Sequence, residues 1–301
     1  MTWTAIRWVW QLEAPLYMGM PPAGALNRCR LYVPARAVHG ALAAEFARAK
    51  VADNASRLPD YGKLGHELGN QCRFTYWYPA RKINGDYQPW LPCFKQDVGL
   101  QWDCLSTQEI LSDQDFRRRL LDARPGVSIA PQSDAAAEGQ LWETECLSQW
   151  WLDADRRRDM PEPVFLVGYV FLKDDAFQRC LRECSVLFLG GDTRCGLGKI
   201  RQVSWTPLRD DQPVFDATVT YHENGPVLRT ERILGHEKIC REAPGAIDFG
   251  MQEIVGGWNI NSVFADCLSW APGSKTAGDV CWCIDRFGYW SRHAASHAPE
   301  A

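Results

Sequence analysis

The residues best suited to chemistry lie between 189 and 201, where glycines and cations crowd together. This stretch, called the glycine loop below, contains Gly190, Gly191, Gly196, Gly198, Arg194, Lys199 and Arg201. Glycine lacks a Cβ, so such a loop can take positive φ and expose its amides. Amides flanked by cations form an anion site, and the usual anion is phosphate. Apolar residues 186–189 before the loop and alternating residues 200–205 after it predict two flanking strands.

The spacing of the loop excludes two common nucleotide-cofactor motifs. A Walker loop needs Gly-Lys-Ser/Thr, whereas Leu197 follows Gly196 here. The dinucleotide motif Gly-x-Gly-x-x-Gly is absent, and this loop leads into a predicted strand and not a helix. Two interpretations remain for the loop alone: a site for the phosphates of a larger ligand, or a glycine-rich turn with surface cations.

The histidines are the candidates for acid–base catalysis. Metal-independent RNA cleavage needs a general base and a general acid beside the reacting hydroxyl and the leaving oxygen. His39 falls at the start of a predicted helix and His236 in a loop or at a strand end. No pair of suitable residues stands at a spacing that commits the chain to cleavage, and residues 34–44 contain no carboxylate. We therefore expect no catalytic residues.

The twelve cysteines favour reduced thiols or a metal over disulfides, because no secretory signal precedes them. Cys180 and Cys184 share a helical face, but no second close pair follows at zinc-finger spacing. We expect no cofactor; the alternative is a zinc ion bound by His66, Cys72, Cys93 and Cys104.

Composition limits the class of protein. The chain has 301 residues, of which 46% are hydrophobic, and a net charge of −4. No apolar stretch is long enough to cross a membrane, so we expect a cytoplasmic protein without membrane contact. The net charge argues against an independent, basic nucleic-acid binder, but it allows a subunit whose cations gather in one groove.

The elements that would position these residues follow from periodicity. Alternation predicts strands at 3–12, 30–33 and 164–172, and Asn224-Gly225 predicts a hairpin within 214–239. Helical spacing predicts helices at 37–52, 174–184 and 107–122, the last capped by Ser106 or Thr107. Residues 53–160 otherwise look irregular.

The glycine loop resembles the glycine-rich motif of the RAMP superfamily, whose members build CRISPR effector complexes. Three further segments resemble family motifs in the expected order. Residues 32–43 resemble the start of the first helix, and residues 127–129 with 135–145 resemble a middle segment. Gly257-Trp258-Asn259 with 271–274 resembles the C-terminal motif of the type III subunits, most like type III-D, that hold the 5′ end of the guide RNA.

The resemblance implies an α+β protein with one or two ferredoxin-like βαββαβ units and a thumb-like insertion. The core would comprise 1–52 plus 163–292, the insertion 53–162, and a flexible tail 293–301. The implied function is a non-catalytic subunit that binds the 5′ tag of crRNA and caps the backbone filament. Its partners would be crRNA, backbone RAMP subunits, a large signalling or nuclease subunit and, indirectly, target RNA.

The residues expected to contact RNA are the seven of the glycine loop together with Arg36, His39, Arg81 and Lys82. Two alternative functions stay open. The RAMP superfamily also contains metal-independent endoribonucleases that process CRISPR repeat RNA. The other alternative is a protein-interaction scaffold without RNA contact.

Overall fold

Strand β1 (Thr4–Leu12) is an inner strand of the largest sheet. The computed structural model describes residues 3–52, 58–152, 161–173, 175–239, 247–259 and 262–293. β1 pairs antiparallel with β10 (Phe165–Leu172) on one side and with β12 (Lys199–Pro207) on the other. The sheet runs in the order β11-β12-β1-β10-β4-β5-β6-β7, and β3 also pairs with β10. Its other strands are β3 (Cys72–Phe74), β4 (Tyr78–Ile83), β5 (Asp86–Lys95), β6 (Gly99–Cys104), β7 (Glu109–Ser112) and β11 (Val186–Phe188).

Indole rings fill the core beside this sheet. Trp8 lies 5.0 Å from Trp10 and 5.5 Å from Trp77, measured between ring centroids. Gly168 of β10 faces Trp8 across the ladder, and a Cβ at this glycine would lie 1.8 Å from the Trp77 ring. The sheet therefore needs glycine at position 168 to admit the tryptophan cluster.

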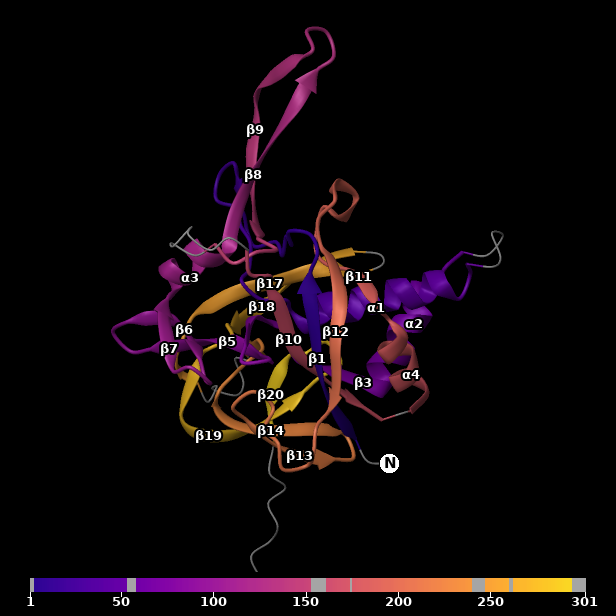
Figure 1. The fold of residues 1–301 in the computed structure, drawn as a ribbon, viewed down its shortest axis with the longest axis vertical. Coiled ribbons are helices and arrows are strands. Elements are labelled where there is room, and N and C mark those ends of the chain that lie inside the picture. The colour runs from indigo at the N-terminus through magenta and orange to yellow at the C-terminus, as the bar shows by residue number, and fades with distance from the viewer. Residues whose placement is uncertain are drawn as a thin grey trace, which may run out of the picture.

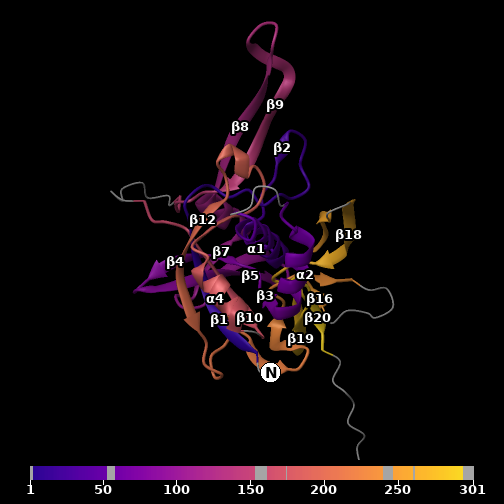
Figure 2. The same ribbon diagram turned by 90° about the vertical axis from the view of Figure 1, so that its right-hand side faces the viewer.

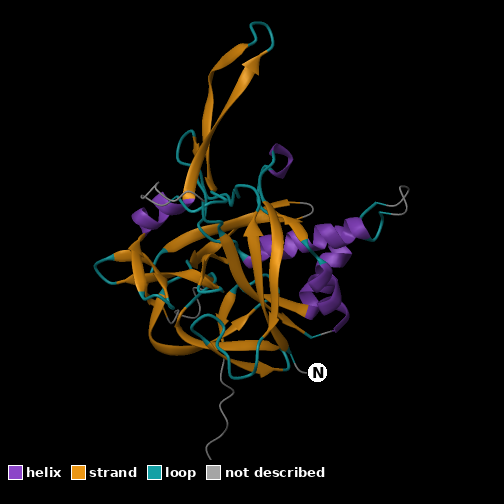
Figure 3. Ribbon diagram, in the orientation of Figure 1, coloured by secondary structure: helices purple, strands orange, loops and turns teal. Residues whose placement is uncertain are grey.

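Helices α1 (Ala35–Ala49), α2 (Tyr61–Gln71) and α4 (Asp175–Glu183) lie together on one side of the molecule (Figures 1 and 3). Val38 and Leu42 form part of the buried face of α1. Helix α3 (Asp113–Leu120) lies apart, beside β6 and β7. Among the described helices, none is both long and apolar enough to cross a membrane.

A second sheet comes mainly from the C-terminal part of the chain, in the order β13-β14-β19-β20-β15-β18-β17, with β16 on β19. Its strands are β13 (Thr218–His222), β14 (Gly225–Arg232), β15 (Glu237–Lys238), β16 (Ile247–Phe249), β17 (Gln252–Asn259), β18 (Ser262–Trp270), β19 (Lys275–Ile284) and β20 (Trp290–Arg292). The β17 strand is therefore a sheet edge.

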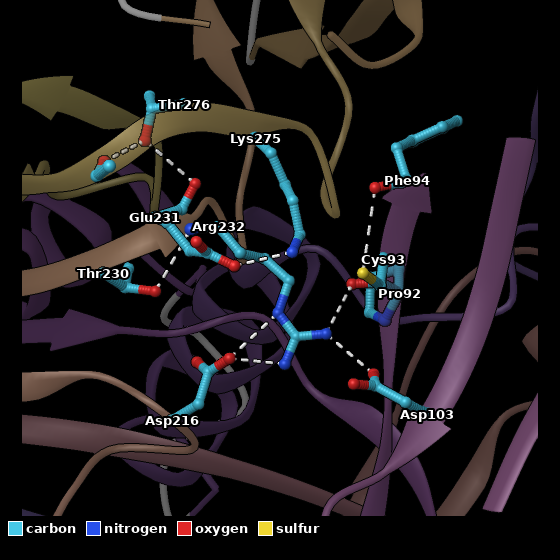
Figure 4. A network of polar contacts seen from close by, with 11 residues as sticks. Pro92, Cys93, Phe94, Asp103, Asp216, Thr230, Glu231, Arg232, Lys275 and Thr276 are labelled. Carbon is cyan, nitrogen blue, oxygen red and sulfur yellow. Dashed lines mark hydrogen bonds and ion pairs between the residues drawn. The ribbon is translucent and has the colours of Figure 1, made fainter. Parts of the chain in front are cut away.

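Arg232 of β14 joins the two sheets (Figure 4). Its guanidinium donates to Asp103 of β6 at 2.7 Å, to the carbonyl of Pro92 at 3.2 Å, and to Asp216. Only 4% of the arginine side chain is exposed. The turn between β18 and β19 also links the sheets, because the N–H of Phe94 of β5 donates to the carbonyl oxygen of Gly273 in this turn at 2.9 Å.

A long hairpin of β8 (Leu121–Ala130) and β9 (Ala135–Leu147) stands out from the body (Figures 1 and 2). The short strand β2 (Leu26–Asn27) pairs with the base of β9, which completes a three-stranded sheet. Leu141, midway along β9, is 64% exposed.

Several sequence predictions are confirmed, namely the strands at β1 and β10, the helices at α1 and α4, the strands on either side of the glycine loop, and the hairpin of β13 and β14. The prediction of a strand at 30–33 is wrong, because only Val33 forms a bridge, to Trp77. Arg30 and Tyr32 instead take part in a buried side-chain network.

The prediction for the helix at 107–122 is correct in type and wrong in its start. Residues 109–112 pair with β6, so the helix begins only at Asp113. Its cap is Ser112, whose Oγ accepts a hydrogen bond from the N–H of Asp115 at 3.1 Å, and not Ser106 or Thr107.

The range 53–160 was expected to be irregular, but its described part contains α2, α3 and strands β3–β9. Two of these strands, β3 and β4, pair directly with β10 of the central sheet. The boundary between core and insertion stays a prediction. In the tail at 293–301, residues 294–301 lie outside the described part.

Candidate nucleic-acid interface

A cavity of about 730 Å³ opens between the glycine loop, the start of α1 and the edge strand β17. We call it the loop–helix cavity. Its remaining walls are residues 17–21 and the turn before β20. The full lining is Tyr17, Met18, Gly19, Met20, Pro21, Arg30, Pro34, Arg36, Ala37, Tyr76, Gly190, Gly191, Ile254, Val255, Gly256, Phe287 and Tyr289.

The glycine loop reaches this cavity because two of its glycines pack closely against residue 17. A Cβ at Gly190, where φ is +76°, would lie 2.2 Å from the carbonyl oxygen of Tyr17. A Cβ at Gly191 would lie 2.8 Å from the Tyr17 ring. Larger residues at either position would push the loop away from the cavity wall.

The expectation that the loop presents bare amides is wrong for three of its four glycines. The N–H of Gly191 donates to the carbonyl oxygen of Tyr17 at 3.0 Å, and the N–H of Gly198 donates to the carbonyl oxygen of Pro15 at 2.8 Å. Gly196 donates to Thr193 within the loop at 3.3 Å. The carbonyl groups of the neighbouring backbone at Pro15 and Tyr17 need hydrogen-bond donors, and the amides of the glycine loop supply them. The glycines therefore serve close packing first.

The cations of the loop do not line the cavity. Lys199 Nζ lies 3.0 Å from the carboxylate of Glu13, which also binds Arg201. Hydrogen bonds from Lys199 and Arg201 hold the pKa of Glu13 below its usual value. Arg194 is exposed in the 3₁₀ turn Thr193–Cys195.

The first turn of α1 brings positive charge to the cavity. Pro34 is the N-cap and provides no side-chain hydrogen bond, and the turn contains no acidic residue. The backbone N–H groups of this first turn and the positive end of the helix dipole therefore favour an anion here. Arg36 adds a guanidinium, which lies 5.3 Å from the centre of the Phe287 ring.

His39 lies behind the cavity wall. Only 8% of the residue is exposed, and its Nε2 lies 2.9 Å from the carbonyl oxygen of Gly65. Burial lowers the pKa of His39, so the ring is neutral at pH 7. Its ring packs edge-on against Phe287 at 5.8 Å. In this position His39 supports the wall and does not line it.

Arg81 and Lys82 of β4 also lie outside the cavity. The guanidinium of Arg81 lies 4.3 Å from the Trp151 ring centre and 3.3 Å from Glu162. Lys82 lies over the ring of Tyr87. Of the predicted RNA contacts, the structure thus brings Gly190, Gly191 and Arg36 to the cavity. The RNA-binding roles of all these residues stay predictions.

A buried polar network holds β17 against the body beneath the cavity. Glu253 of β17 accepts hydrogen bonds from Arg30 and, at 2.9 Å, from the hydroxyl of Tyr32. His236 bridges the network, with Nε2 2.6 Å from Glu253 and Nδ1 2.6 Å from the hydroxyl of Tyr76. Residues distant in sequence therefore fix the wall formed by β17.

Neighbouring groups keep the carboxyl of Glu253 in its negatively charged form. Burial alone would raise the pKa of Glu253, but the hydrogen bond from His236 and the charge of Arg30 lower it to about 2. Burial lowers the pKa of His236, and its contact with Glu253 only partly offsets this effect. The stable form is a carboxylate beside a neutral imidazole and a guanidinium.

Sequence reasoning missed the aromatic wall of the cavity. Phe287 and Tyr289 come from the turn between β19 and β20, which lies about 250 residues after the start of α1. The available signal was Gly288, a glycine between two aromatic residues, whose φ of +82° marks a turn pressed against Ala35. Tyr17 was hidden in a segment that looked like a simple loop.

The described residues contain no group of three or more His, Cys, Asp or Glu placed to hold a metal ion. The set considered for zinc is spread over helix α2 and three different strands, with His66 in α2 and Cys104 on β6. Cys72, Cys93 and Cys104 are buried thiols in this structure.

No protein-family model matches the sequence, and no curated protein matches it significantly. A chain of the Type III-B Cmr-beta cryo-EM structure bound to cognate target RNA and AMPPnP is 14% identical, with a TM-score of 0.51, over 89% of this chain and 84% of that chain. A chain of Type III-B Cmr-beta bound to cognate target RNA is 15% identical, with a TM-score of 0.49, over 89% of this chain and 85% of that chain. The chain therefore shares its fold with a chain of the Type III-B Cmr-beta structure bound to target RNA and AMPPnP.

Proposed function

We propose that this chain is a non-catalytic RNA-binding subunit of a type III CRISPR effector complex, and that it holds the 5′ end of the guide RNA in the loop–helix cavity. One observation carries the proposal. Among the described residues, the cavity lining contains two arginines, four aromatic rings and the positive end of α1, and no carboxylate. Such a wall suits phosphates and unpaired bases together.

The topology supports the RAMP interpretation. Within the central sheet, β12, β1, β10 and β4 lie in that order, all antiparallel, with α1 after β1 and α4 after β10. We infer that these elements form one ferredoxin-like βαββαβ unit. The shared fold with a chain whose assembly was solved with cognate target RNA supports the same assignment.

The remaining partners follow from this assignment. Backbone RAMP subunits would contact the chain beside the guide, and target RNA would reach it only through the guide. A large signalling or nuclease subunit is a further proposed partner, and the site of action would be the cytoplasm. Because the net charge is −4, binding depends on the local potential of the cavity.

The proposal excludes cleavage by this chain, because the two histidines near the cavity are engaged. His236 is fully buried between Tyr76 and Glu253, and His39 is turned toward Gly65. A general base must reach the proton that it removes. Purified protein incubated with CRISPR repeat RNA and EDTA should therefore leave the RNA intact; specific cleavage would establish the endoribonuclease alternative.

Binding is tested by Arg36→Gln, with Arg48→Gln as the matched control. Arg48 lies in the same helix but is 53% exposed and paired with Glu45. The affinity for the RNA that co-purifies should fall roughly tenfold in Arg36→Gln, and the salt dependence should lose about 0.7 of a unit of slope. Arg48→Gln should leave both unchanged. Absence of a discrete co-purifying RNA would favour the protein scaffold.

A further inference from the structure

Phe287 lies in the turn between β19 and β20, which is fixed by hydrogen bonds and close packing. The Asp285 carboxylate accepts hydrogen bonds from the N–H of Phe287 at 2.7 Å and from that of Tyr289 at 2.9 Å. Gly288 of this turn packs closely against the start of α1, because a Cβ added at Gly288 would lie 2.2 Å from the Cβ of Ala35. The backbone beneath the ring therefore has little freedom to move.

Three side chains surround the same ring. The guanidinium carbons of Arg36 and Arg286 lie over the ring, 5.3 Å and 4.9 Å from its centre, and His39 packs edge-on at 5.8 Å. Guanidinium groups are attracted to aromatic faces and leave the ring oriented. Phe287 is partly exposed and forms part of the cavity wall. A base bound here would stack on the surface that the ring and the two flat guanidinium groups form together.

The polar groups deepest in this wall already have partners. Arg30 binds Glu253 and Tyr32, and the hydroxyl of Tyr76 lies 2.6 Å from His236. A flat aromatic ligand would therefore gain more from stacking than from hydrogen bonds to its edge. Stacking is tolerant of base identity because every base has a π-face.

We propose that Phe287 is a stacking platform for one unpaired base of the bound RNA, which the cavity accepts without reading the identity of that base. The inference rests on the proposed function, because it needs an RNA strand in the loop–helix cavity. The cavity volume of about 730 Å³ is sufficient for a nucleotide.

The test uses the full chain and a short single-stranded oligoribonucleotide in which 2-aminopurine replaces one base at a time. The fluorescence should change most at one position on binding to wild-type protein, because that base exchanges its neighbouring bases for the Phe287 ring. Phe287→Leu should remove that change and weaken binding roughly 5- to 150-fold, whereas Phe287→Trp should keep a change at the same position and the affinity. The control Phe188→Leu, at a 47% exposed phenylalanine outside the cavity lining, should behave as wild type.

The RNA itself supplies a second test that needs no protein variant. An abasic residue at the position of the largest fluorescence change should weaken binding by a similar factor, while exchange among the four bases should change it much less. If wild-type protein binds no RNA, the proposed function fails. If it binds RNA, loses affinity in Arg36→Gln, and tolerates both Phe287→Leu and the abasic residue, only this inference fails.

Discussion

Glu253 is the residue whose charge matters most for the shape of the cavity, because it ties β17 to Arg30, Tyr32 and His236. Replacing it with glutamine leaves Arg30 buried without its counter-charge. We expect Glu253→Gln to lower the free energy of unfolding by about 3 kcal/mol at pH 7. Glu231→Gln is the control, because Glu231 is 52% exposed in its pair with Lys275 and should cost less than about 1 kcal/mol.

The same residue predicts a pH dependence. The pKa of Glu253 is about 2 in the folded chain, against an ordinary value of 4.5. Since the unfolded chain takes up the proton first, the stabilisation is complete above about pH 5 and is lost as the pH falls toward 2. Urea unfolding between these pH values should show a shallower acid-side loss in Glu253→Gln than in the wild type. Equal slopes would contradict this role.

Arg232 makes a second prediction at the residue scale. Arg232→Met removes a buried cation and leaves the carboxylates of Asp103 and Asp216, each 24% exposed, facing each other without it. The expected loss is roughly 3–5 kcal/mol of unfolding free energy. Arg229→Met, in the same strand, removes an arginine that is 63% exposed and should cost less than about 1 kcal/mol. Similar losses in the two variants would show that Arg232 does not join the sheets.

At the scale of elements, the β8–β9 hairpin is expected to be dispensable for folding. Val127 and Leu141 face each other across the ladder and are both exposed, whereas β2 pairs only with residues 143 and 144. Replacing 128–140 with Asn-Gly would join that facing pair by a two-residue turn. The unfolding free energy should change by less than about 1 kcal/mol. Loss of the cooperative transition would show that the tip supports the body.

The hairpin also shows which elements the sequence could predict. β1 and β10 are predictable because burial imposes alternating or continuous apolar residues on them. Most of β9 is exposed, so its start, Ala135-Ala136-Ala137-Glu138-Gly139, carries no such pattern. Helix α3 was placed too early because the register of β7, a tertiary contact with β6, is invisible in local periodicity.

At the scale of the whole molecule, the candidate site was only partly predictable. The glycine loop and Arg36 are local signals, and the structure places Gly190, Gly191 and Arg36 at one cavity. The pairing of Lys199 and Arg201 with Glu13 depends on the neighbouring strand, so the sequence could not show that these cations are already engaged. Phe287 and β17 reach the cavity only through long-range packing.

Mapping of RNA contacts on the whole protein tests the central claim most directly. RNA bound to the purified full chain can be crosslinked by ultraviolet light and the modified peptides identified by mass spectrometry. The account predicts crosslinks at Tyr17, Phe287 and Tyr289, which line the loop–helix cavity. Crosslinks confined to exposed aromatic residues elsewhere, such as Tyr61 or Trp150, would place the RNA on another surface and contradict it.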